Sequence, residues 1–401
     1  MPQSISARRR VVLSDAGRVW HDPAAMSARR VLLFSDAQLY AGAERYLVEL
    51  ARGLPKDHWA VEIVCSESEG VDALAAEFTD AGLPVKRLPE IPTLKARGAF
   101  LKVARYFATH RADILHFNLT DPRSCNGAMT AARMAMRGRF VCTEHLPTST
   151  FDDRPLPFRH RLAARSTAAT IVNTAAGRVA MQARPHHNGS VTVIPNGIPD
   201  PGDPTPEQRA AARAELGFDP HHLLVGWVGR FAEQKDPDLM LEGIRRVHDV
   251  IPDVRFALIG DGPLFHATEA RINELEIGAV TRCYGFRRDA AELLCGLDVL
   301  VNTSRYEGMP FTILEAMFRR VPVVGTRIAG NEQLIAHLAS GVTYAQQDGD
   351  ALGDALHVAL GDRDRMLRFG RVARERALLL HSLEGMCART AQVYDDTLSG
   401  Q

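Results

Sequence analysis

Several structural signatures are missing from this sequence of 401 residues. No apolar run approaches the roughly 18 residues that span a bilayer. The apolar stretch after the arginines at positions 8–10 is too short for a signal peptide. The six cysteines show neither Cys-x-x-Cys nor paired spacing, so neither a disulfide framework nor a zinc site is predicted. These absences favour a protein that is not exported and works in the cytoplasm.

The sequence also has no net charge, because 48 Lys and Arg balance 48 Asp and Glu. Without an excess of positive charge, no nucleic-acid partner is expected. The balance hides an asymmetry, since residues 1–198 carry a net charge of +8 and residues 199–401 one of −8. Basic residues are densest in the stretch 95–184. The surface that this stretch forms is either exposed to solvent only, or in contact with an anionic membrane surface or a phosphorylated acceptor.

Short β-branched and aliphatic runs alternate with longer segments of helical periodicity from Val31 onward. Such alternation predicts a doubly wound parallel sheet with helices on both faces. Prolines cluster between residues 195 and 220, as in a linker, and a second series of the same kind follows. The chain is therefore expected to comprise a loose extension (1–28), two Rossmann-like domains (29–198 and 199–380) and a C-terminal helix (381–401).

Each predicted domain opens with a candidate anion site. Gly42 lies where a helix should begin, so free N–H groups there would favour a phosphate, although with a single glycine an ordinary turn is the more common alternative. In the second domain, Gly229 and Arg230 end a strand and Lys235 precedes a helix. Two cations that bracket such a loop can converge on one anion. A leaving diphosphate would require such cations, because they stabilise the negative charge that grows on it. The alternative is a pair of solvated cations.

Two glutamates stand eight residues apart in the segment EGMPFTILEAM. Glu307 falls in a loop at the carboxyl end of a predicted strand, where open α/β sheets bind ligands, and Glu315 falls on the following helix. A loop carboxylate can accept from sugar hydroxyls, and one on the helix can accept from both hydroxyls of a ribose. The amides of residues 311–313 would start that helix, while Gly308 and Pro310 shape the loop.

Three polar residues of the first domain follow or end predicted strands. They are His116, Asn118 and His145. A lone histidine in such a place is more often a structural residue than a functional one. His145, with a proline two residues later, is the better functional candidate.

Together, Gly42-Ala43-Glu44, His145, Arg230 with Lys235, and the segment from Glu307 to Glu315 resemble the retaining glycosyltransferases of family 4. The resemblance covers nearly all of the chain from Val31 onward. It implies the GT-B fold, in which two Rossmann-like domains face each other across a cleft. Domain 29–198 would bind the acceptor, domain 199–380 a nucleotide-sugar donor, and helix 381–401 would cross back to the first domain.

The resemblance also implies roles for individual residues. Arg230 and Lys235 would hold the diphosphate, Glu307 the transferred sugar and Glu315 the ribose. The catalytic group would comprise His145, Arg230, Lys235 and Glu307, and the cleft on the acceptor side would include His116 and Asn118. The residues expected to bind the donor are Gly42, Gly229, Arg230, Lys235, Phe286, Glu307, Gly308, Pro310, Phe311, Thr312, Ile313 and Glu315.

The activity implied is transfer to a hydroxyl acceptor, such as a glycan, a lipid-linked sugar or a natural product. Attack would come from the same face as the leaving group, with no metal ion and no cofactor. Two alternatives remain open, a catalytically silent binding subunit and a nucleotide-sugar 2-epimerase. A nicotinamide-dependent dehydrogenase is disfavoured, because no Gly-x-Gly-x-x-Gly follows any predicted strand. The expected location is the cytoplasm, or the inner face of the membrane as a peripheral protein.

Overall fold

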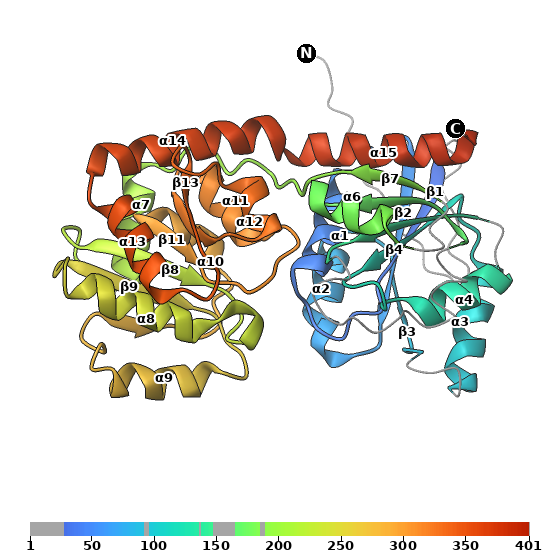
Figure 1. Cartoon of the computed structure of the whole chain (residues 1–401). Coiled ribbons are helices and arrows are strands. Elements are labelled where there is room, and N and C mark those ends of the chain that lie inside the picture. The colour runs from blue at the N-terminus through green and yellow to red at the C-terminus, as the bar shows by residue number, and fades with distance from the viewer. Residues whose placement is uncertain (1–27, 92–95, 136–137, 147–164, 185–188, 401) are drawn as a thin grey trace, which may run out of the picture.

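The structure is a computed structural model that describes residues 28–91, 96–135, 138–146, 165–184 and 189–400. Two α/β domains lie side by side, and two long helices run along one side of the pair (Figure 1). Each domain is built on one parallel sheet. The extension expected over residues 1–28 falls almost wholly outside the described residues and stays a prediction.

The N-terminal domain has a seven-stranded sheet in the order β3-β2-β1-β4-β5-β6-β7. The chain starts in the middle of this sheet and winds outward in both directions, as in Rossmann-like domains. Its strands are β1 (Arg29–Phe34), β2 (Trp59–Ser66), β3 (Val85–Leu88), β4 (Ile114–Leu119), β5 (Arg139–Glu144), β6 (Thr167–Val172) and β7 (Ser190–Val193). Its helices are α1 (Gly42–Gly53), α2 (Asp72–Asp80), α3 (Arg97–Thr109), α4 (Asn126–Ala135) and α6 (Ala175–Gln182).

The C-terminal domain repeats this plan in a six-stranded sheet of order β10-β9-β8-β11-β12-β13. Its strands are β8 (Leu223–Val228), β9 (Val254–Ile259), β10 (Thr281–Cys283), β11 (Val299–Asn302), β12 (Val323–Thr326) and β13 (Gly341–Tyr344). Its helices are α7 (Pro206–Glu215), α8 (Pro237–His248), α9 (Phe265–Glu274), α10 (Ala290–Leu293), α11 (Phe311–Phe318), α12 (Ala329–Leu334), α13 (Gly349–Leu360) and α14 (Arg363–Leu380). The two parallel sheets confirm the predicted fold class.

The central strands are buried on both faces, which explains why they appear in the sequence as continuous apolar runs. All six residues of β4 and all four of β11 are buried. One hydrophobic cluster runs through both domains, because α1 and α11 supply Leu47 and Phe311 to it. The two domains are therefore packed against each other as well as joined by the chain.

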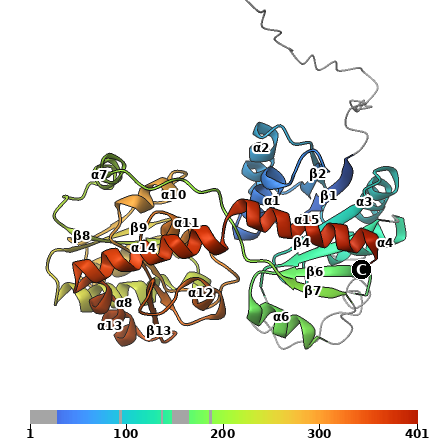
Figure 2. The same ribbon diagram turned by 90° about the horizontal axis from the view of Figure 1, so that it is seen from above.

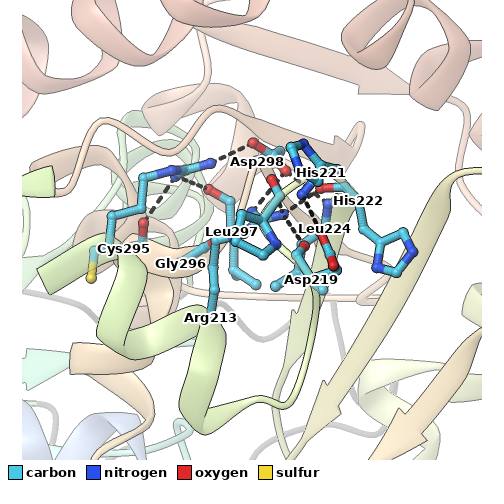
Figure 3. A network of polar contacts seen from close by, with 11 residues as sticks. Arg213, Asp219, His221, His222, Leu224, Cys295, Gly296, Leu297 and Asp298 are labelled. Carbon is cyan, nitrogen blue, oxygen red and sulfur yellow. Dashed lines mark hydrogen bonds and ion pairs between the residues drawn. The ribbon is translucent and has the colours of Figure 1, made fainter. Parts of the chain in front are cut away.

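Helix α7 follows the proline-rich linker and is anchored to the C-terminal domain by polar contacts, in which Arg213 and Asp298 take part (Figure 3). Arg213 is buried, and its Nη1 donates to Oδ2 of Asp298 at 3.1 Å. Arg209 pairs with the other oxygen of the same carboxylate. Asp298 also accepts from the Leu224 N–H at 2.7 Å. One carboxylate thus ties α7 to the start of β8 and to the loop before β11.

The last two helices belong to different domains. Helix α14 lies on the C-terminal domain, and α15 (Leu383–Ser399) lies across the N-terminal domain (Figure 2). Tyr394 of α15 is fully buried there, with its hydroxyl 2.5 Å from Nδ1 of His116. Its ring packs edge-on against Trp59 of β2, with 5.1 Å between the ring centroids. Helix α15 therefore completes the core of the N-terminal domain.

The two connections between the domains run side by side. The Ile198 N–H in the linker donates to the His381 carbonyl at 3.1 Å, and the Leu383 N–H donates to the Ile198 carbonyl at 3.1 Å. A Cβ on Gly197 would lie 2.3 Å from the Ser382 carbonyl, so only glycine fits this close approach. The two crossings are thus joined by hydrogen bonds into one double connection between the domains.

Candidate functional site

The first turn of α1 is held in place by Glu44, the buried acid of the Gly42-Ala43-Glu44 segment. Its Oε2 accepts from the Ala41 N–H at 3.2 Å, and its Oε1 accepts from the Ser35 hydroxyl at 3.3 Å. Burial raises the pKa of Glu44 to about 7. Gly42 is exposed beside this anchor, and a Cβ there would lie 3.8 Å from the ring of Phe311 in the other domain. The amide end of α1 thus faces the start of α11.

His145 follows β5 and is oriented by an amide. Its Nε2 lies 2.8 Å from Oδ1 of Asn118, while Nδ2 of Asn118 donates to the Ala43 carbonyl at 3.0 Å. Because Oδ1 only accepts, the ring proton sits on Nε2 and leaves Nδ1 as an acceptor. Burial lowers the pKa of His145 to about 3, so the ring is neutral at pH 7.

Two of the expected cleft residues are interior residues instead. His116 has no exposed surface, and its ring nitrogens contact the hydroxyls of Tyr394 at 2.5 Å and Thr143 at 2.8 Å. Asn118 is 1 % exposed and is occupied by Ala43 and His145. The expectation that both face an acceptor is thereby corrected. Strand-end position alone could not separate them from His145, because it does not show that α15 and α1 cover this part of β4 through Tyr394 and Ala43.

Lys235 contacts a carboxylate rather than an open anion site. Its Nζ pairs with Oε1 of Glu307, which also accepts from the Ser304 hydroxyl at 2.7 Å. A Cβ on Gly229 would lie 3.5 Å from the Lys235 side chain. Arg230 is exposed and pairs with no carboxylate among the described residues. The two cations therefore differ in state, one being neutralised by Glu307 and the other open to an anion.

The loops that carry Lys235 and Glu307 are joined by polar contacts. Thr303 donates its hydroxyl to the Lys235 carbonyl at 2.6 Å and accepts from Nε1 of Trp227 at 2.9 Å. Nε of Arg305 donates to Oδ2 of Asp236 at 2.8 Å, and Asp236 adopts a left-handed backbone at the start of α8. The carboxyl ends of β8 and β11 thus form one rigid platform.

A glycine pair outside the predicted site shapes the same edge of the sheet. Gly260 has a φ of +140°, and a Cβ there would lie 1.9 Å from the Gly229 carbonyl. Its N–H donates to the Gly285 carbonyl at 2.8 Å. The segment Gly260-Asp-Gly262 lets three loops approach each other closely. Phe286, next to Gly285, is 71 % exposed.

Helix α11 begins directly after Pro310, at the position where the sequence places a helix start. The side chains of Phe311 and Ile313 are buried and that of Thr312 is half-buried. This turn therefore offers main-chain amides, rather than side chains, to a ligand. Glu315 lies one turn further along and is 4 % exposed. Burial raises the pKa of its carboxyl group, and an arginine of the other domain opposes that rise.

The structure brings the histidine of one domain and the glutamate segment of the other into direct contact. A Cβ on Gly308 would lie 2.1 Å from the main-chain oxygen of His145, so the two backbones touch. Nη1 of Arg45, on α1, lies 2.7 Å from Oε1 of Glu315. Sequence reasoning missed Arg45, whose only local signal is its i,i+4 spacing to Glu49.

Part of the basic stretch 95–184 is neutralised by acids from other elements. Lys102 pairs with Glu67 at 2.8 Å, and Arg184 pairs with the buried Glu144. Residues 147–164 lie outside the described part of the chain, so the idea of a membrane-binding face stays a prediction. Among the described residues, no helix combines the length and the hydrophobicity that a membrane crossing needs.

Two family profiles match the chain, one in each domain. Residues 208–376 match the family described as Glycosyl transferases group 1. Residues 40–200 match Glycosyltransferase Family 4. The two matches lie end to end and take in most of both domains.

Curated relatives share part of the sequence. The UDP-Gal:alpha-D-GlcNAc-diphosphoundecaprenol alpha-1,3-galactosyltransferase of Escherichia coli is 29% identical over 170 residues, which are 41% of this chain and 44% of the relative. The D-inositol 3-phosphate glycosyltransferase of Mycobacterium sp. (strain KMS) is 32% identical over 186 residues, 44% of this chain and 40% of the relative. The chain thus spans less than half of the length of these relatives.

Solved structures show the same architecture over nearly the whole chain. The crystal structure of HepE from Anabaena in complex with UDP and glucose has a TM-score of 0.79 at 19% identity, covering 92% of this chain and 100% of HepE. A glycosyltransferase from Rickettsia africae has a TM-score of 0.77 at 17% identity, covering 93% and 100%. These likenesses confirm the GT-B fold. The two profile matches show that the chain belongs to glycosyltransferase family 4.

Proposed function

We propose that this protein transfers a sugar from a nucleotide-sugar donor to a hydroxyl acceptor, with retention of anomeric configuration. The observation that carries the proposal is the contact between His145 and Gly308, which joins the acceptor-side domain to the loop of Glu307. Around this contact lie a paired lysine, an open arginine and a buried glutamate from different elements. An anionic donor with a sugar and a ribose matches that set of groups in charge and in hydrogen-bonding capacity.

Each part of the donor has a matching group on the facing surfaces. Arg230 and Lys235 supply positive charge for the diphosphate, and the amides at the start of α11 add donors. Glu307 accepts from hydroxyls of the transferred sugar, and Glu315 accepts from the ribose. Gly42, at the exposed start of α1, lets main-chain amides approach the distal phosphate. When the donor binds, its diphosphate replaces Glu307 as the partner of Lys235. The sugar hydroxyls then replace Lys235 as the partners of Glu307.

The transfer step follows from these placements. The acceptor oxygen bonds to the anomeric carbon on the face from which the phosphate oxygen leaves, so the configuration is retained. The departing diphosphate takes the acceptor's proton, and Arg230 and Lys235 stabilise the charge that grows on it. In this mechanism the two cations take the part that a metal ion plays elsewhere, and no cofactor is used. His145, neutral at pH 7, lies beside the sugar as a hydrogen-bonding group.

The acceptor is proposed to be a glycan or a lipid-linked sugar. The E. coli relative is named for a diphosphoundecaprenol-linked acceptor, and the basic stretch 95–184 has the charge that an anionic acceptor or the inner face of a membrane needs. The proposed location is accordingly the cytoplasm, with peripheral contact at the membrane.

The experiment that tests the proposal begins with nucleotide binding. A thermal-shift screen with UDP, GDP and ADP, with and without EDTA, should give an EDTA-insensitive shift for one of them. A nucleotide present at about 100 times its Kd stabilises the folded state by about 2.7 kcal/mol. The matching nucleotide sugars are then incubated with glycan and lipid-linked acceptors, and the product is analysed by NMR for its anomeric configuration.

Each alternative has its own outcome in this experiment. Release of an α-linked product from an α-linked donor supports retention, whereas a β-linked product contradicts it. Binding of a nucleotide without any transfer or hydrolysis identifies a silent subunit. A nucleotide sugar recovered with altered stereochemistry at the sugar's C2 identifies an epimerase.

A further inference from the structure

The side chain of Arg45 crosses from one domain to the other. Arg45 belongs to α1, but its Nη1 lies 2.7 Å from Oε1 of Glu315 on α11. Its guanidinium also lies over the ring of Phe311, 5.5 Å from the centroid. Within α1, its Nε lies 3.6 Å from Oε1 of Glu49. Contacts from both domains therefore hold the guanidinium where the two domains meet.

Glu315 depends on a cation to stay ionised. Its side chain is 6 % exposed, and burial raises the pKa of the carboxyl group. Arg45 lowers this pKa most among the charged neighbours, followed by Arg319, and Glu292 of α10 raises it. Arg319 donates to the main-chain oxygen of Glu315 at 3.3 Å rather than to the carboxylate. Within the described part of the chain, Arg45 is thus the one cation paired with this carboxylate.

Arg45 forms an ion pair with Oε1 of the carboxylate, a buried atom that has no hydrogen bond in the described part of the chain. No described residue donates a hydrogen bond to Oε2 of Glu315 either. A vicinal diol, such as the 2′- and 3′-hydroxyls of a ribose, donates two hydrogen bonds, and only an ionised carboxylate accepts both with full strength. A protonated Glu315 would lose one acceptor and gain a competing donor. Ribose recognition therefore requires that Glu315 carry its charge.

We infer that Arg45 is a positioning residue for the nucleotide, which holds Glu315 ionised and oriented from the opposite domain so that its carboxylate receives the ribose diol. This inference rests on the proposed function, because it takes Glu315 as the ribose acceptor. It adds that neither domain alone completes the ribose subsite. Arg45 itself need not touch the nucleotide.

The variants that test the inference separate the charge of residue 45 from its other side-chain properties. Arg45→Gln removes the charge, Arg45→Lys keeps it, and Glu315→Gln reports the loss of the carboxylate. The matched control is Arg52→Gln, since Arg52 lies on the same helix and pairs with Glu77 of its own domain. The readout is the Kd, by calorimetry, of the ribonucleoside diphosphate that binds wild type and of its 2′-deoxy analogue.

Wild type should prefer the ribonucleotide over the 2′-deoxy form by about tenfold, the scale of one hydrogen bond to a charged group. Arg45→Gln should weaken ribonucleotide binding by about tenfold and bring the preference close to one. The affinity of Arg45→Gln for the ribonucleotide should then rise with pH, because Glu315 without Arg45 ionises only at higher pH. The affinity of wild type should stay constant over the same pH range. Arg45→Lys and Arg52→Gln should behave like wild type.

The outcomes separate this inference from the proposed function. If Glu315→Gln abolishes the ribose preference and Arg45→Gln keeps it, the role of Arg45 is refuted and the proposed donor site stands. Equal loss of preference in Arg45→Gln and Arg45→Lys would also refute it, because charge would not be the cause. If wild type binds none of UDP, GDP and ADP, the proposed function fails, and the inference fails with it. A circular dichroism melt of each variant establishes that the fold is intact.

Discussion

Lys235 and Glu307, which stand 72 positions apart in the sequence, form an ion pair at the adjoining ends of β8 and β11. Both side chains are largely buried, and the Ser304 hydroxyl supports the same carboxylate oxygen. The pairing orients each group before any ligand is present. It also means that a ligand which uses one of them must first compete with the other.

Replacement of Lys235 by alanine should reduce turnover by about a hundredfold, the scale for removal of one preorganised group that stabilises charge in a transition state. The change also leaves Glu307 without its cation. Steady-state assay of nucleoside diphosphate release measures the effect. Arg371→Ala is the matched control, because Arg371 is ion-paired too, but with Glu375 on the same helix, α14, outside both the candidate site and the basic stretch. Unaltered turnover in Lys235→Ala would remove this lysine from the site.

A methyl group at Gly308 should keep the domains apart. Its Cβ would lie 2.1 Å from a main-chain oxygen of His145, and main chain cannot move aside as a flexible side chain can. Gly308→Ala should therefore lower kcat/KM by about a hundredfold, the effect of a 1 Å misplacement, and increase the radius of gyration in small-angle scattering. Gly98→Ala, where an added Cβ would meet nothing within 4 Å beyond its own helical turn, should change neither quantity. A Gly308→Ala protein with normal activity would contradict the observed contact.

The two arginines of α7 should contribute unequally to stability. Arg213 is 6 % exposed and donates to Asp298 and to several main-chain carbonyls, whereas Arg209 is 40 % exposed. Arg213→Met should cost about 3 kcal/mol, as for a broken buried pair. Arg209→Met should cost about 1 kcal/mol or less, as for an exposed pair. Urea unfolding compares the two directly, and equal costs would show that burial of Arg213 does not govern the energetics.

The buried His116 should make the fold sensitive to acid. Burial lowers the pKa of His116 to about 3, while the unfolded chain titrates near 6.5. Below pH 6.5 the unfolded state binds a proton that the folded state does not, so stability present above that pH is lost as the pH falls. The stability gap between wild type and His116→Gln should narrow by about 2 kcal/mol from pH 7.5 to 5. Other titrating groups cancel in this difference, and a constant gap would place the histidine pKa near its ordinary value.

Much of the fold was accessible from the sequence, because its signals are local. Strands that are buried on both faces are apolar along their whole length, as in β4 and β11. Proline clusters mark the linker, and helical periodicity predicts α14 and α15. The docking of α15 was not accessible from periodicity, since Tyr394 meets His116 across 278 positions of sequence. Only the family resemblance suggested that crossing.

Less of the candidate site than of the fold could be predicted from the sequence. Strand ends and helix starts led to His145, Lys235 and Glu307, because parallel sheets place such positions along one edge. The same rule also selected His116, whose side chain points into the core instead. Arg45 was missed because its partner lies in the other domain, and no spacing rule describes a contact between domains.

The position of α15 also determines the order in which a nascent chain can finish its domains. The C-terminal domain has all of its strands, and α14, once residue 380 has been synthesised. The N-terminal domain lacks Tyr394 until α15 emerges, although it is translated first. The usual vectorial order, in which the leading domain folds to completion before the next one, is thus inverted here. A ribosome that stalls before residue 383 should present an N-terminal domain with the apolar surface around Trp59 uncovered, which is a substrate for chaperones.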